Sequence, residues 1–197
     1  MSHLKSYIEQ LTTDISLERQ NVLLPLVNYI QSKRSKGEMP QLNFICTHNS
    51  RRSQLGQVWM QAIGSFYGID LACFSGGVEI TACAQQTIKV LINSGFNITE
   101  LNFNINPKFR VHQDSFDITL FSKLFDDEVN PKDKFAAIMT CDHAEANCPF
   151  VPGCEVRIPI TYVDPKLYDD TPQESEEYLR RSDQIAAEMK WVISKIS

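Results

Sequence analysis

The sequence lacks any apolar run of membrane-spanning length, and it has no excess of basic charge. Residues 1–10 also lack the charged-then-apolar pattern of a signal peptide. Lysine and arginine number 19 against 24 aspartates and glutamates, which gives a net charge of -5. Because binding to phosphate backbones requires a basic face, nucleic acid is excluded as the main partner. We expect a cytoplasmic protein that binds neither membranes nor nucleic acid.

Internal repeats and low-complexity segments are absent too, and 197 residues suffice for one sizeable core. Cysteine, by contrast, is well represented. The six cysteines are Cys46, Cys73, Cys83, Cys141, Cys148 and Cys154. In a reducing cytoplasm they stay mostly reduced, so a disulfide among them is expected to be catalytic rather than structural. Cys73 and Cys83 occupy apolar positions and are predicted to be small core residues.

Residues 1–38 carry two apolar stripes at helical spacing. Pro25 is expected to kink or restart the second helix, and Gly37 ends it. The stripes need burial. We therefore predict an N-terminal helical extension over residues 1–38, a hairpin of helices packed on the main domain.

The remaining residues, 39–197, alternate between strand and helix patterns. The predicted strands are Gln41–Cys46, Leu71–Ser75, Phe135–Thr140 and Arg157–Tyr162. Helices are expected after the first of these strands, over Ile80–Ile92, and after a capping box with proline at Thr171–Glu174. This alternation predicts an α/β domain in three layers, with a doubly wound, parallel four-stranded sheet.

One segment departs from that alternation. Lys108–His112 and Phe116–Ser122 alternate like a β-hairpin, and a polar loop follows them. We predict an insertion at about residues 101–134, placed beside the main sheet. Trp59, on the helix after the first strand, is expected to be a core residue.

The most informative stretch is Cys46–Ser53, Cys-Thr-His-Asn-Ser-Arg-Arg-Ser, which lies between the first strand and its helix. A loop that opens a helix points backbone N–H groups and the positive end of the helix dipole at one spot, where a tetrahedral oxyanion fits. The same field favours the thiolate of Cys46, a competent nucleophile. Arg52 offers a planar fork for two oxygens, and Ser53 can cap the helix and hold the thiolate. The predicted oxyanion-binding residues are Thr47, His48, Asn49, Ser50, Arg51, Arg52 and Ser53.

A second cysteine pair, Cys141 and Cys148, lies seven residues apart across a polar segment. The segment alone allows a metal site with His143 and Cys154, two unrelated thiols, or a redox pair. Cys141 and Asp164 each follow a predicted strand, as Cys46 does, so all three are expected at one edge of the sheet. With a thiolate at that edge, a thiol relay is favoured, because exchange proceeds by attack of one thiolate on another sulfur. We expect neither a metal ion nor another cofactor.

These residues resemble the thioredoxin-coupled arsenate reductases, which share the fold of the low-molecular-weight protein tyrosine phosphatases. The resemblance covers about Gln41–Asp170, interrupted by the insertion. In this superfamily the loop is Cys, five residues, Arg and Ser or Thr, as in Cys46, Arg52 and Ser53, with Asn49 at the position of an asparagine that braces it. Gln54 stands where phosphatases commonly have proline. Cys141 and Cys148 match the spacing of the reductase relay.

The resemblance implies a mechanism and partners. Cys46 attacks arsenate, Arg52 holds its oxygens, and Asp164 is the general acid. Cys141 then releases arsenite by attacking Cys46, and Cys148 attacks Cys141 to form a disulfide that a thioredoxin-like donor reduces. Arsenate or phosphate is thus the expected ligand.

Three positions depart from the family pattern. Reductases of this group often bind potassium partly through a glutamate where this chain has Gln57. His48 replaces a usual glycine, and Arg51 replaces a small residue or cysteine.

Two alternatives stay open. Hydrolysis of phosphomonoesters through a cysteinyl-phosphate needs only Cys46, Arg52 and Asp164. A non-enzymatic module that binds oxyanions or metal would use the same loop without turnover.

Overall fold

The computed structural model describes residues 3–147 and 150–196. Its elements in chain order are α1 (His3–Gln10), α2 (Leu17–Ser35), β1 (Gln41–Cys46), α3 (Arg52–Phe66), β2 (Ala72–Gly77), α4 (Gln85–Asn93), β3 (Asn97–Glu100), β4 (Phe109–Gln113), β5 (Phe116–Leu120), β6 (Phe135–Met139), α5 (Asp142–Asn147), β7 (Cys154–Pro159), the 3-10 helix η1 (Pro165–Tyr168) and α6 (Glu174–Ser194). Among these described residues, no helix combines the length and apolar character that a bilayer span requires.

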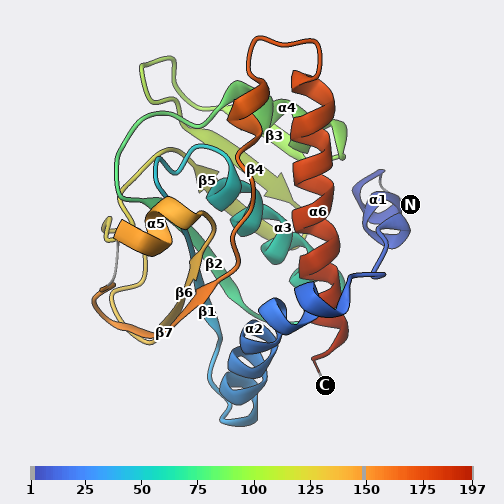
Figure 1. Cartoon of the computed structure of the whole chain (residues 1–197), viewed down its shortest axis with the longest axis vertical. Helices are drawn as coiled ribbons and strands as arrows, with labels where there is room; N and C mark the ends of the chain where they lie inside the picture. The colour runs from blue at the N-terminus through green and yellow to red at the C-terminus, as the bar shows by residue number, and fades with distance from the viewer. Residues whose placement is uncertain (1–2, 148–149, 197) are drawn as a thin grey trace.

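The central sheet has the strand order β2-β1-β6-β7, and all its neighbouring pairs are parallel (Figure 1). This confirms the predicted four-stranded sheet. Three strands differ from their predicted ranges: β2 spans Ala72–Gly77 rather than Leu71–Ser75, β6 ends at Met139 rather than Thr140, and β7 spans Cys154–Pro159 rather than Arg157–Tyr162. The apolar residues after Pro159 follow the sheet in extended form, and Ile160 N–H still donates to the carbonyl of Met139.

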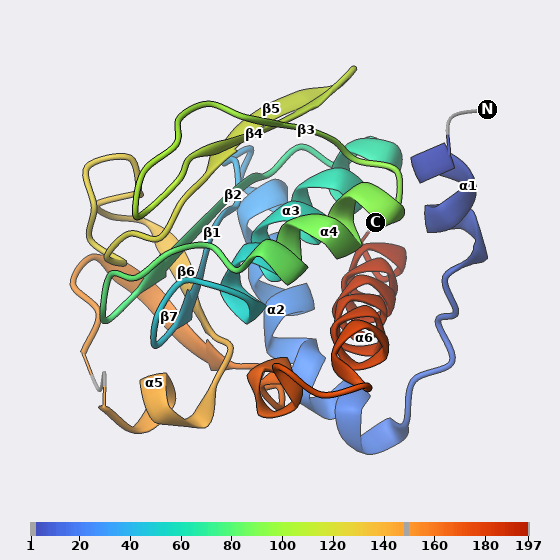
Figure 2. The same ribbon diagram turned by 90° about the horizontal axis from the view of Figure 1, so that it is seen from above.

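Helices cover the two faces of the sheet unequally (Figure 2). On one face α3 packs against β1, β2 and α6, and Trp59 is fully buried there with its Nε1–H donated to Ser182. The core prediction for Trp59 is therefore confirmed. On the other face, the part of the chain that the structure describes forms the short helix α5 and irregular segments, whose Phe125 and Val151 pack against the buried side chains of β6.

The two N-terminal helices pack against the main domain at separate places. They lie on opposite sides of α6 (Figures 1 and 2), so the predicted hairpin is wrong. Pro25 lies inside α2, because fully buried leucines at positions 23 and 26 hold the helix on both sides of it. At the start of α2, Arg19 donates to Glu188 of α6 at 2.8 Å, and the Tyr162 hydroxyl donates to the same carboxylate at 2.7 Å.

Residues 97–120 form a separate antiparallel sheet, β3-β4-β5. The predicted hairpin is confirmed as β4 and β5. The third strand, β3, was not predicted, because Asn97–Glu100 is short and mostly exposed and has no alternating pattern.

Two predicted helix starts are wrong. The helix expected from Ile80 begins at Gln85, since residues 78–84 bind the loop after β1 through their backbone instead. The expected capping box at Thr171–Glu174 does not form. The Thr171 hydroxyl donates to the carbonyl of Tyr168, and the Glu174 carboxylate accepts from Asp170 N–H, so both side chains close the preceding turn.

Candidate active site

The loop between β1 and α3 is built around the sulfur of Cys46. Asn49 N–H donates to Sγ at 3.2 Å, and the Ser53 hydroxyl lies 3.0 Å from Sγ. Asn49 also donates its side-chain amide to Ser53 Oγ at 2.8 Å. Asn49 has φ of 46°, the left-handed conformation that curls a loop so that successive N–H groups face inward. The result is a concave loop whose donors surround one buried thiol.

Ser53 does not cap the helix as predicted. The residue before α3 is Arg51, which makes no side-chain capping bond. Ser53 lies in the first turn of α3, where its hydroxyl is shared between Cys46 and Asn49. Cys46 and Ser53 are both buried at the base of the loop, so the hydroxyl bonds to these neighbours rather than to the backbone of α3.

Gly77 lets the end of β2 lie directly against the loop. A Cβ on Gly77 would lie 2.7 Å from the carbonyl oxygen of Thr47 and 2.8 Å from the nitrogen of Asn49. Val78 N–H donates to the same Thr47 carbonyl at 2.8 Å, and the Ser122 hydroxyl donates to the carbonyl of His48 at 2.7 Å. The outward-facing carbonyls of the loop are thus occupied, which leaves its N–H groups for a ligand.

Arg52 and Asp164 close one side of a small cavity above Cys46. Arg52 donates to Asp164 Oδ2 at 2.5 Å and to the carbonyl of Tyr162 at 3.0 Å. Asp164 Oδ1 accepts from Lys166 N–H at 3.1 Å, so the aspartate both begins η1 and reaches the site. The residues lining this cavity are Cys46, His48, Ser50, Arg51, Arg52 and Asp164.

The side chains of His48 and Arg51 are engaged at the rim. His48 Nε2 lies 3.3 Å from the Glu79 carboxylate. Arg51 donates from Nε to the Tyr178 hydroxyl at 2.6 Å, and from Nη2 to Asp169 at 3.2 Å. Their bonds tie the loop to residues 78–84 and to the start of α6.

Cys141 lies beside the loop, as predicted, two residues after β6. Its sulfur is 3.4 Å from the Thr47 hydroxyl and accepts from Ala144 N–H at 3.3 Å. Both Cys46 and Cys141 belong to the same buried apolar cluster. Cys141 is not among the residues that line the cavity. It lies on the side of the loop where the Thr47 hydroxyl contacts its sulfur. Cys148 lies outside the described residues.

The remaining cysteines bear on the alternatives. Cys73 and Cys83 are buried, which confirms their predicted core role, and burial raises the pKa of Cys83 to about 12. Cys154 is partly exposed on β7. Within residues 3–147 and 150–196, no group of three or more histidine, cysteine, aspartate or glutamate side chains is placed to hold a metal ion.

A buried polar network beneath the loop escaped the sequence reasoning. Gln54 donates to the carbonyl of Asn49 at 2.9 Å, and Lys123 N–H donates to Asn49 Oδ1 at 3.2 Å. Ser75 donates to Gln57 at 2.7 Å. The available signal was polar residues on the buried face of an amphipathic helix, since Gln54 and Gln57 are both buried among the apolar residues of α3.

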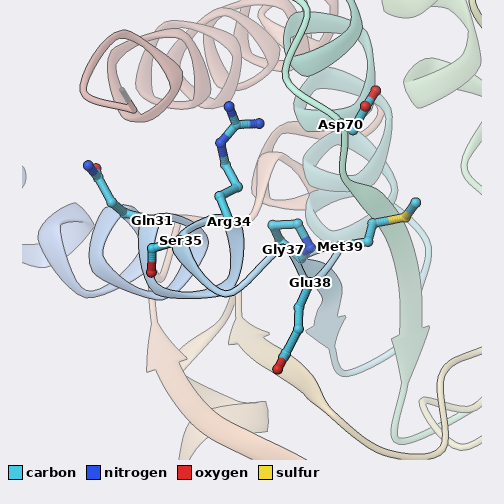
Figure 3. A pocket seen from close by; sticks show the side chains of 8 residues that line it. Gln31, Arg34, Ser35, Gly37, Glu38, Met39 and Asp70 are labelled. Atoms are coloured by element: carbon cyan, nitrogen blue, oxygen red, sulfur yellow. The ribbon is translucent and has the colours of Figure 1, made fainter.

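A wider cavity of about 520 Å³ lies elsewhere. Figure 3 shows its lining side chains, which come from the end of α2 and the turn after it, with Asp70 before β2. It borders the start of β1, whereas Cys46 ends that strand. It therefore takes no part in the site around Cys46.

No protein-family model matches the chain. Among curated proteins, an arsenate reductase of Staphylococcus epidermidis is 28% identical over 109 residues, which are 55% of this chain and 66% of that relative. The match thus spans slightly less than two thirds of the relative's length. An arsenate reductase of Halalkalibacterium halodurans is 26% identical over 148 residues, which are 75% of this chain and 90% of that protein.

Two solved structures show the same fold. The low-molecular-weight protein tyrosine phosphatase from T. tengcongensis superposes with a TM-score of 0.54 at 16% identity, covering 80% of this chain and 99% of that one. A low-molecular-weight phosphotyrosine phosphatase from Vibrio cholerae gives 0.53 at 12% identity, covering 79% and 95%. The predicted fold is thereby confirmed.

Proposed function

We propose, from this phosphatase fold and the sequence similarity to arsenate reductases, that the protein reduces arsenate to arsenite through a cysteine relay. The observation that carries the proposal is the position of two thiols. Cys46 lies in a loop that donates hydrogen bonds to its sulfur, and Cys141 lies beside that loop against Thr47.

The first step is nucleophilic attack. The Cys46 thiolate, stabilised by Asn49 N–H and the Ser53 hydroxyl, attacks arsenic and forms an S–As bond. Arg52 releases Asp164 and donates instead to two oxygens of the bound oxyanion. Asp164, once released from the ion pair, takes up a proton from solvent and gives it to the departing oxygen, which leaves as water.

The second step reduces arsenic. The Cys141 thiolate attacks the sulfur of Cys46, the S–As bond breaks, and its electron pair stays on arsenic, which leaves as arsenite. Cys148 then attacks Cys141, and Cys46 departs as a thiolate. The Cys141–Cys148 disulfide is returned to two thiols by a dithiol donor of the thioredoxin type. A disulfide needs Cα atoms within about 7 Å, whereas the six helical residues of α5 span about 9 Å, so the second disulfide requires α5 to unwind or shift.

The decisive experiment replaces the second thiol. Cys141→Ser is expected to abolish arsenate reduction, measured with thioredoxin, its reductase and NADPH, and to spare hydrolysis of an aryl phosphate by the same preparation. Cys154→Ser is the matched control, because Cys154 is a partly exposed thiol on β7 away from the cavity. Survival of both activities in Cys141→Ser would contradict the relay.

Phosphomonoester hydrolysis is the second candidate, and the ion pair between Arg52 and Asp164 at the cavity favours it. These two residues with Cys46 supply a nucleophile, an anion clamp and a proton donor, which together suffice for a cysteinyl-phosphate mechanism. Efficient aryl phosphate turnover with no arsenate reduction would select this candidate.

A further inference from the structure

A buried ammonium group lies behind the Cys46 loop. Lys123 is 2% exposed, its Nζ donates to Ser75 Oγ at 3.4 Å, and it lies 4.7 Å from the centre of the Phe121 ring. Among the described residues, no carboxylate forms an ion pair with Lys123. Burying a charge without a partner ion is costly.

Lys123 is joined to Asn49 directly and to the polar network beneath it. Its backbone N–H donates to Asn49 Oδ1 at 3.2 Å. Its ammonium donates to Ser75 Oγ, and the Ser75 hydroxyl donates to Gln57 Oε1 at 2.7 Å and lies 3.5 Å from Gln54 Oε1. Gln54 donates from Nε2 to the Asn49 carbonyl at 2.9 Å. The buried cation thus belongs to the same polar network that holds the backbone of the loop.

The hydrogen bond from Gln54 to the Asn49 carbonyl fixes the direction of the next backbone donor, the N–H of Ser50. In a planar trans peptide the carbonyl of Asn49 and the N–H of Ser50 point in opposite directions. Gln54 holds the carbonyl on the side of the network, so the Ser50 N–H faces the cavity that Ser50 lines. A donor bound to that carbonyl also strengthens the N–H as a donor, since hydrogen bonds in a chain polarise one another.

We propose that Lys123 is a positioning residue, an internal cation that orients the loop and makes it prefer dianionic over monoanionic tetrahedral oxyanions. Its charge acts through a low-dielectric interior, where it is screened less than a surface lysine. The inference rests on the oxyanion site of the proposed function and adds a determinant of ligand charge to it.

The preference should depend on pH. Burial lowers the pKa of Lys123 to about 8, although the charges of Asp127 and Cys83 oppose the shift. Two further titratable groups lie near it. Cys73 and Lys123 line one cavity behind the loop, and the ammonium of Lys108 lies 4.6 Å from the centre of the Phe121 ring. Below pH 8 the cation is present, and above it the cation is lost. Affinity for a dianion is therefore expected to fall as pH rises through 8.

The test is calorimetric binding of inorganic sulfate, a dianion throughout the range, between pH 7.5 and 9.5. A Cys46→Ser background removes the nucleophilic thiol from the site. The protein with Lys123 is expected to lose several-fold in affinity across the range. Lys123→Gln should bind about tenfold more weakly at pH 7.5 and show no such loss, whereas Lys123→Arg should keep tight binding at both ends.

Lys108→Gln is the matched control, because it removes an exposed lysine from the same ring and is expected to change affinity less than twofold. Equal affinities of the Lys123→Gln protein and the protein that keeps Lys123, at every pH, would overturn the inference. A sulfate affinity that does not change with pH in the protein that keeps Lys123 would also overturn the inference, and this measurement needs no substitution at position 123. Absence of sulfate binding by every variant would overturn the oxyanion site itself, and the inference with it.

Discussion

The Cys46 loop and the Cys141 segment differ in how firmly each is held. Loop residues 46–53 are bound on every side by β2, residues 78–84, Ser122 and the polar network under Asn49. The Cys141 segment leads into α5, a helix of six residues tied by the Thr47 contact and by Arg157, which donates to Glu145 at 2.8 Å. For the proposed reaction, the contrast predicts a preorganised anion site and a thiol exchange that needs the helix to move.

The strongest test of this contrast compares the two thiols. Cys46→Ser is expected to lower both arsenate reduction and aryl phosphate hydrolysis by about 10⁴-fold or more, since both need the sulfur nucleophile. Cys141→Ser removes only the first activity. Steady-state assays of both activities on both variants measure the difference. A Cys46→Ser protein that retains either activity would place the nucleophile elsewhere.

A smaller loss is expected for Arg52→Lys. The lysine keeps the charge but cannot form two parallel hydrogen bonds to an oxyanion, so kcat/KM should fall by about 10²-fold in both assays. Arg180→Lys is the control, because Arg180 pairs with Glu177 on the exposed surface of α6. A loss confined to arsenate reduction would show that Arg52 serves the relay rather than the anion.

Gly77→Ala tests the firmness of the loop directly. The new Cβ would meet backbone atoms of Thr47 and Asn49 at less than 3 Å, so unfolding free energy should fall by about 1–3 kcal/mol. Denaturant unfolding monitored by fluorescence measures it. Gly68→Ala is the comparison variant. Gly68 has φ of 68° but nothing within 4 Å of its added Cβ, so this substitution strains the backbone without causing a clash. An unchanged free energy of unfolding in Gly77→Ala would mean that the loop shifts to accommodate the new Cβ at little cost.

The mildest change is Thr47→Val, which removes the hydroxyl between Thr47 and Cys141 while keeping the shape of the side chain. We expect Cys141 to be alkylated several-fold faster, because one of the contacts that hold its segment closed is lost. Aryl phosphate hydrolysis should change less than threefold. Mass spectrometry of iodoacetamide-treated protein gives the rate, and no change would assign the closed position to packing alone.

The sequence predicted the parallel sheet and the cysteine loop because both depend on local order. Buried strands read as apolar runs, and Cys46, Arg52 and Ser53 are fixed by spacing along one turn. It missed contacts between distant residues. The predicted contact between Ser53 and Cys46 is present, but Ser53 was also predicted as a cap, because nothing local shows that Asn49 shares its hydroxyl. The partnership of Lys123 with Ser75 likewise joins positions separated by 48 residues.

The shared carboxylate of Glu188 has a consequence for the first 38 residues. Glu188 is 3% exposed and accepts from Arg19, Tyr162 and Gln184, while the carbonyl of Tyr162 accepts from Arg52. Removing residues 1–38 would leave the buried Glu188 carboxylate without Arg19, its ion-pair partner. Tyr162 links that carboxylate to Arg52. The opening helices thus supply the counter-ion of a carboxylate that bonds to the neighbour of Arg52, and a shortened protein is expected to be perturbed at the cavity that Arg52 lines.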